Sequence, residues 1–120
     1  MRLYLDTNVI MDFLLDRHQP STDLILRSIA CAHELFVSDW TFTELQQQGL
    51  MTETRWFVAF CGRKLSVIVA THDDMLFARA LPTHAQDALH YALARSCDAL
   101  VMHNVRDFPF PRVVTPRDVK

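Results

Sequence analysis

The sequence has little glycine, little lysine and no long apolar run. Gly49 and Gly62 are the only glycines among 120 residues, whereas half of the residues are hydrophobic. This composition is typical of a globular chain and argues against a disordered one. Because no apolar run approaches bilayer-spanning length, and because Arg2 and Asp6 place charges near the start, we expect neither a membrane span nor a signal peptide.

Neither the cysteine spacing nor the net charge matches a pattern that identifies a function. Cys31, Cys61 and Cys97 are odd in number and widely spaced, without a CxxC pair. We therefore expect free thiols in a reducing cytoplasm, and neither a disulfide framework nor a zinc motif. The net charge of −2 gives no general signature of nucleic-acid binding.

Short apolar segments alternate with longer amphipathic segments along the chain. Strands are expected at 3–5, 35–38, 65–69, 99–102 and 113–114. Helices are expected at about 8–17, 20–32, 38–48, 51–61, 71–81 and 83–96, with a terminal helical turn after residue 115. This alternation predicts an α/β fold in one domain, 1–120, with three α/β/α layers and a central parallel sheet of four to five strands.

Four acidic residues occupy comparable places in this predicted fold. Asp6 and Asp107 come just past strand ends, and Glu44 lies early in the helix after the second strand. Ligands of open α/β sheets bind beyond the carboxyl ends of the strands, so these three side chains are expected at one edge. Asp87 follows a helix–helix turn and is less directly placed by this argument. Asp6, considered alone, could equally serve only as a helix cap.

A cluster of these carboxylates would repel itself, because the only lysines, Lys64 and Lys120, are distant in sequence. A divalent cation would stabilise it, and oxygen-only ligands favour Mg²⁺ or Mn²⁺ over zinc. A metal held by carboxylates suits phosphate chemistry, since it activates water and neutralises phosphate charge.

The order of these motifs resembles the PIN domain. Asp6-Thr7-Asn8 opens the chain, Glu44 follows Ser38, residues 87–90 read Asp-Ala-Leu-His, and Asn104 precedes Asp107-Phe108. The stretches 6–17 and 113–116 are similar to the corresponding parts of VapC-like toxins of bacteria and archaea. Two features depart from that pattern: Met102 stands where many relatives have threonine, and the segment between Glu44 and Leu65 is short.

The resemblance implies a Mg²⁺- or Mn²⁺-dependent ribonuclease, usually the toxin of a toxin–antitoxin pair. It implies an RNA substrate, an antitoxin protein as partner and a homodimer in the cytoplasm. By position, Asp6, Glu44, Asp87 and Asp107 become an acidic quartet that holds the metal and performs catalysis. Asn8 and Asn104 become polar supports of that site.

Several residues admit two interpretations. His90, three residues after Asp87, could orient a phosphate or a water, or it could simply pack its helix. Arg106 could contact a substrate phosphate or pair with an acid. The other aspartates are interpreted as solvated helix or turn acids, with Asp12 the least certain of them.

The aromatic residues Trp56, Phe57 and Phe60 are typical of a core, although in such a toxin they could line a dimer face or an antitoxin groove. The alternative function is a non-catalytic module that binds RNA or protein on the same scaffold. A receiver domain or aspartyl phosphatase fits less well, because the lysines are badly placed and Asn8 stands where a second aspartate is needed.

Overall fold

The computed structural model describes the chain apart from residues 31–32, 109 and 120 and the side chain of Asp107. The predicted assignments of Cys31, Ala32 and the Asp107 carboxylate therefore lie outside the described part. Cys61 and Cys97 are free and buried, as expected. Among the described residues, no helix is both long and apolar enough to cross a lipid bilayer.

The centre of the fold is a five-stranded sheet in which every neighbouring pair of strands is parallel. Its strands, in the spatial order β3-β2-β1-β4-β5, are β1 (Arg2–Leu5), β2 (Glu34–Ser38), β3 (Leu65–Ile68), β4 (Ala99–Val101) and β5 (Val113–Val114). The α-helices are α1 (Thr7–Leu14), α2 (Gln19–Ala30), α3 (Asp39–Gln47), α4 (Met51–Cys61), α5 (His72–Arg79) and α6 (Ala85–Leu93). Four 3₁₀ turns complete it: η1 (Gly62–Lys64), η2 (Ala94–Ser96), η3 (Val105–Asp107) and η4 (Pro116–Asp118).

The predicted three-layer α/β/α fold with a parallel sheet is thus confirmed, and the predicted elements differ from the structure mainly at their ends. The first helix stops at Leu14 rather than near residue 17, where Asp16 adopts a positive φ of 52°. The helix predicted at 83–96 is divided into α6 and the 3₁₀ turn η2. Such tightening of a last turn is common at helix ends.

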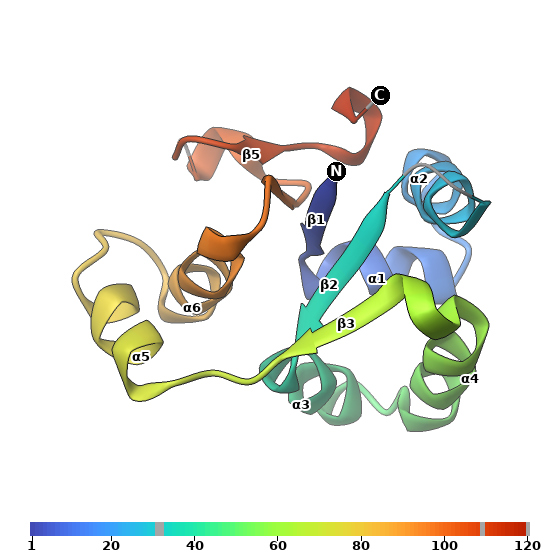
Figure 1. Ribbon diagram of the computed structural model, residues 1–120, viewed down its shortest axis with the longest axis horizontal. Helices are drawn as coiled ribbons and strands as arrows, with labels where there is room; N and C mark the ends of the chain where they lie inside the picture. The colour runs from blue at the N-terminus through green and yellow to red at the C-terminus, as the bar shows by residue number, and fades with distance from the viewer. Residues whose placement is uncertain (31–32, 109, 120) are drawn as a thin grey trace.

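Side chains alternate across the sheet and divide the core into two layers. Leu3 and Leu5 of β1 are fully buried against residues of α1, α2, α3 and α4. Tyr4, between them, is buried on the opposite face with Leu93 of α6. This period of two follows from the pleat of a strand. Figure 1 shows α1 to α4 on one side of the strands and α5 and α6 on the other.

Two helices begin directly at the carboxyl ends of neighbouring strands. Asp6 separates β1 from α1, and β2 runs through Ser38 straight into α3. From β1 the chain continues to β2 on one side, whereas β4 pairs with the other side of β1. The carboxyl ends of β1 and β4 therefore flank the point where strand order reverses, which is the usual ligand site of an open parallel sheet.

The prediction that all three aromatic residues of α4 belong to the core is wrong for two of them. Phe57 is 1% exposed, but Trp56 is 53% exposed and Phe60 is 37% exposed. An α-helix directs residues one position apart to different sides, so Trp56 cannot share the inward face of Phe57. The rings of Trp56 and Phe60 stack on each other instead, with centroids 4.9 Å apart.

Two capping boxes of the same kind occur in different surroundings. Ser38 Oγ accepts a hydrogen bond from the Thr41 amide at 3.2 Å, and Thr41 Oγ1 accepts one from the Ser38 amide at 3.2 Å. Thr71 and Asp74 make the equivalent reciprocal pair at 3.2 and 3.0 Å. Ser38 is fully buried and also accepts from the Tyr4 hydroxyl, whereas Thr71 is exposed.

We predict that Ser38→Ala destabilises the protein more than Thr71→Ala. Each change removes a helix cap, which costs about 1 kcal/mol of unfolding free energy. Only Ser38→Ala also leaves the buried Tyr4 hydroxyl without this acceptor, so its cost should reach about 2–3 kcal/mol. Chemical denaturation of both variants checks this difference, and equal losses would contradict it.

Candidate acidic active site

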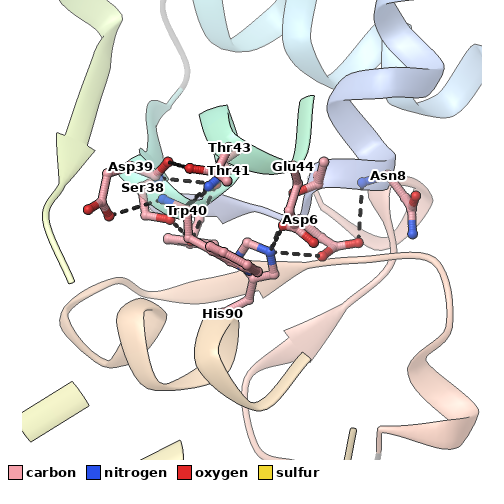
Figure 2. Close-up of polar contacts among 11 residues, drawn as sticks. Asp6, Asn8, Ser38, Asp39, Trp40, Thr41, Thr43, Glu44 and His90 are labelled. Carbon is pink, nitrogen blue, oxygen red and sulfur yellow. Dashed lines mark hydrogen bonds and ion pairs between the residues drawn. The ribbon is translucent and has the colours of Figure 1, made fainter. Parts of the chain in front are cut away.

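Asp6 lies at the carboxyl end of β1 and is 6% exposed. Its amide donates to the carbonyl of Val101 at 2.9 Å, so the pairing of β1 with β4 extends to Asp6 itself. Its Oδ2 accepts from the Asn8 amide at 3.4 Å, which makes Asp6 the N-cap of α1 (Figure 2). The capping role considered from the sequence is therefore present, and it directs the carboxylate toward the other acids rather than away from them.

Glu44 of α3 and His90 of α6 meet beside Asp6, although they come from opposite layers of the fold. His90 Nε2 lies 2.5 Å from Glu44 Oε1 and 3.9 Å from Asp6 Oδ1. The Thr7 hydroxyl donates to the same Glu44 oxygen at 2.6 Å. Figure 2 shows His90 pointing toward both carboxylates from below. One oxygen of Glu44 is thus held by two protein groups.

His90 continues this contact into the sheet through Tyr4. Its Nδ1 lies 2.8 Å from the Tyr4 hydroxyl, which donates to Ser38 Oγ at 2.8 Å. His90 is 2% exposed and Tyr4 is fully buried. The interpretation of His90 as a packing residue is correct as to its burial, but its ring nitrogens face polar partners. Tyr4 and Thr7 were missed by sequence reasoning, although a tyrosine within a buried strand requires a partner for its hydroxyl.

The charge of Asp87 acts on the carboxyl of Asp6. Burial raises the pKa of Asp6, and the negative charges of Asp87 and Glu44 raise it further, against the opposing effect of His90. Burial also acts to raise the pKa of Glu44, but hydrogen bonds and the charge from His90, together with the Thr7 hydroxyl, lower it overall. Glu44 is therefore compensated within the protein, whereas Asp6 is not.

The remaining predicted site residues are placed less closely. Asp87 lies in the first turn of α6 and is partly buried, and Asn8 is exposed while its amide caps Asp6. Asn104 precedes η3, which follows β4 and carries the exposed Arg106. The backbone of Asp107 lies in η3, but its side chain is outside the described part. The structure thus brings Asp6 and Glu44 together at His90, whereas the roles of Asp87 and Asp107 in the site stay predictions.

This arrangement fits a hard divalent cation. Asp6 supplies carboxylate oxygens at the carboxyl edge of the sheet, and Asp87 is close enough for its charge to act on Asp6. Both contacts that described residues make with Glu44 are through Oε1, which leaves its second oxygen without a described partner. The raised pKa of Asp6 means that its charged form is disfavoured in the bare protein. A bound cation favours the charged form, so the donor set and its electrostatics agree with Mg²⁺ or Mn²⁺.

A second group of potential ligands lies elsewhere in the described part of the chain. Asp12, His18 and His103 offer ligand atoms that all lie within 4.8 Å of one another, so this group could hold a metal ion. The interpretation of Asp12 as a solvated acid is wrong, because it pairs with both Arg17 and His103. Sequence spacing gave no signal here, since the three residues come from two distant segments.

Comparisons with known proteins show the fold. No family profile and no curated protein matches the sequence. Among solved structures, a toxin–antitoxin complex from Klebsiella pneumoniae superposes with a TM-score of 0.73 at 22% identity, covering 98% of this chain and 99% of that one. VapBC2 from Rickettsia felis, bound to a DNA fragment from its promoter, superposes with a TM-score of 0.71 at 14% identity, covering 96% and 97%.

We predict that Asp6→Asn raises the thermal stability of the metal-free protein at neutral pH. A carboxyl whose pKa is raised by folding stabilises the native state below its unfolded pKa, near 3.8, and loses that contribution as pH rises through the folded value. Asparagine keeps the helix cap but carries no charge. In EDTA the melting temperature should rise by roughly 4 °C for each kcal/mol relieved, and the gain should disappear under acidic conditions.

Asp73→Asn is the matched control for this measurement, because Asp73 is an exposed acid in the first turn of α5. It should not raise the melting temperature. If Asp6→Asn does not raise the melting temperature at pH 7, the buried charge of Asp6 does not destabilise the protein and the prediction is wrong.

Proposed function

We propose that this protein is a Mg²⁺- or Mn²⁺-dependent endoribonuclease and acts as the toxin of a VapC-type toxin–antitoxin pair. The observation that carries this proposal is that Asp6, at the carboxyl end of β1, and Glu44 both lie at His90 Nε2, beside the strand-order reversal of a parallel sheet. The full-length likeness to two toxin–antitoxin structures supports it through the fold. The non-catalytic alternative lacks a reason for burying the carboxyl of Asp6, whose pKa is raised by burial and by neighbouring acids.

Asp6 and Asp87 are the residues assigned to hold the cation, with Asp107 completing the set and Glu44 contributing through its free oxygen or through water. Bound there, a Mg²⁺ or Mn²⁺ ion would activate water and neutralise charge on a phosphodiester. The bound cation would lower the pKa of Asp6 and so favour its charged form.

The protein's own residues position the carboxylates and receive the substrate. His90 and Thr7 fix Glu44 Oε1, so the free oxygen of Glu44 has a defined direction. Tyr4 orients the imidazole of His90 from inside the sheet. Arg106, exposed after β4, is assigned to an RNA phosphate, and Asn104 is assigned to support the same segment. His90 is accordingly a positioning residue in this proposal.

We predict that the purified protein cleaves a mixed RNA pool when Mg²⁺ or Mn²⁺ is present. Cleavage should stop when EDTA is added. Asp6→Asn and Asp87→Asn should each lower the cleavage rate by at least about a hundredfold, since each loses a charged ligand with little change of shape. Gel-based cleavage assays on folded variants measure this, with circular dichroism as the check on folding.

Asp73→Asn should retain the parent rate, because Asp73 lies on the exposed side of α5. Undiminished cleavage by Asp6→Asn, or cleavage that survives chelation, would overturn the assignment of the acidic site. RNA binding without cleavage at saturating metal would favour the non-catalytic alternative.

The antitoxin partner is assigned to the exposed aromatic surface of α4. Phe13, Trp56 and Phe60 stack together there, with centroid distances of 4.9–6.1 Å. They line a cavity of about 650 Å³ that also contains Asp16 and Glu53. An apolar groove with an acidic rim suits an amphipathic helix that carries basic residues, and helix-in-groove docking is a common recognition mode. The homodimer implied by the resemblance stays a prediction.

We predict that co-expression with the product of the neighbouring gene yields a complex in which Trp56 is protected. In a Trp40→Phe background, acrylamide should quench Trp56 fluorescence strongly in the free protein and weakly in the complex. Trp56→Ala should weaken the complex at least tenfold, because buried aromatic anchors dominate such interfaces. Leu76→Ala, a change at a 49% exposed residue of α5, is the control, and equal quenching in both states would contradict this surface.

A further inference from the structure

The group formed by Asp12, His18 and His103 lies outside the acidic cluster and joins three parts of the chain. Asp12 belongs to α1, His18 follows α1 and directly precedes α2, and His103 comes two residues after β4. Their ligand atoms lie within 4.8 Å of one another. They line a cavity of about 420 Å³ whose other walls are Thr115, Pro116 and Arg117. The cavity gives solvent access to the point at which these atoms converge.

Asp12 and His18 each contact a neighbouring side chain that can orient them. Arg17 contacts Asp12 Oδ1 through Nε at 3.1 Å and through a terminal nitrogen at 2.9 Å, which leaves Oδ2 facing the histidines. Ser21 Oγ lies 2.8 Å from His18 Nδ1 and is fully buried. Supporting contacts of this kind orient the ligands of metal sites in proteins. The Ser21 amide also donates to His18 Nδ1, at 3.3 Å, so a cation on the other ring nitrogen would require the ring proton to move to Nδ1, with Ser21 Oγ as its acceptor.

The third ligand, His103, has a ring nitrogen that the protein leaves without a well-formed hydrogen bond. His103 Nε2 lies 2.6 Å from Asp12 Oδ2, close enough for an ion pair. Within the described part of the chain, however, this buried nitrogen has no hydrogen-bond partner of acceptable geometry. The imidazole rings of His18 and His103 meet edge to face, with centroids 4.7 Å apart. Asp12 Oδ2 and His103 Nε2 therefore lie close together without a well-directed hydrogen bond between them.

We propose that Asp12, His18 and His103 bind a divalent transition-metal ion of the zinc class. Two imidazoles and one carboxylate are the ligands of Zn²⁺ and similar ions, whereas Mg²⁺ prefers oxygen alone. Three protein ligands leave at least one coordination position open toward the cavity. Bonds of about 2.0 Å to zinc place tetrahedral ligands roughly 3.3 Å apart, so small side-chain movements complete the site.

An anion is the less favourable occupant, although Arg17 and Arg117 are nearby. Asp12 contributes a negative charge to the convergence point, and Arg17 already pairs with that carboxylate. A phosphate would have to approach the negatively charged carboxylate of Asp12 in order to reach His103. The metal ion satisfies both atoms at once, and it links α1 to the segment that follows β4. This proposal is independent of the proposed ribonuclease activity.

The test is metal titration of the tag-free, full-length protein, monitored by calorimetry with Zn²⁺ and by visible absorption with Co²⁺. We expect one equivalent of Zn²⁺ to bind and the thermal midpoint to rise with Zn²⁺. His18→Ala and His103→Ala should each weaken Zn²⁺ binding at least tenfold and reduce the Co²⁺ absorption. His72→Ala, which removes an exposed histidine of α5, should change neither quantity.

His18→Ala keeps the test valid if His103→Ala fails to fold, because His18 lies in a connection between helices. Asp6→Asn should bind Zn²⁺ like the parent, which separates this site from the acidic cluster. The proposal is overturned if Zn²⁺ does not bind at micromolar concentration, if His18→Ala binds it as the parent does, or if Asp6→Asn alone abolishes binding. Inorganic phosphate raising the midpoint in place of Zn²⁺ would also overturn it in favour of an anion.

Discussion

The hydrogen-bonded chain that runs from Ser38 through Tyr4 and His90 to Glu44 joins all three layers of this fold. Tyr4 supplies a hydroxyl from the central strand, Glu44 comes from the helical layer on one face, and His90 comes from the layer on the other. Because these groups are buried, each depends on the next for a partner, and none can be removed without leaving a desolvated polar atom. The contact therefore fixes the layers and the carboxylates together.

The same burial creates a conflict between stability and use of the site. Glu44 is compensated by His90 and Thr7, but Asp6 is buried beside two like charges and gains only partial relief from His90. A protein selected for stability alone would place a neutral residue at this cap, since asparagine satisfies it as well. A carboxylate at position 6 is explained if a cation binds there during function, because the cation stabilises the charged form of Asp6.

The sequence determined more of the fold than of the site. Alternating apolar segments sufficed for the parallel three-layer arrangement, since strands such as Leu3-Tyr4-Leu5 have no other stable environment. The same pattern predicts that Asp6 and Glu44 follow the carboxyl ends of neighbouring strands, which is where the structure has them. It could not foresee that His90 would pair with Glu44 or that Trp56 would face solvent, because both depend on helix rotation. Asp12, His18 and His103 meet through tertiary packing alone, which local sequence patterns do not predict.

The segment after β4 carries both His103 and the backbone of Asp107. Backbone pairing of the sheet ends where the Met102 amide donates to Val114, and Phe108, 1% exposed, returns the chain to the core. Between them, His103 contacts Asp12 on the side of α1, and the backbone of Asp107 lies one short 3₁₀ turn further along. So few residues cannot take up a displacement of one end without moving the other. Any contact that fixes His103 therefore also restricts the backbone of the 3₁₀ turn η3.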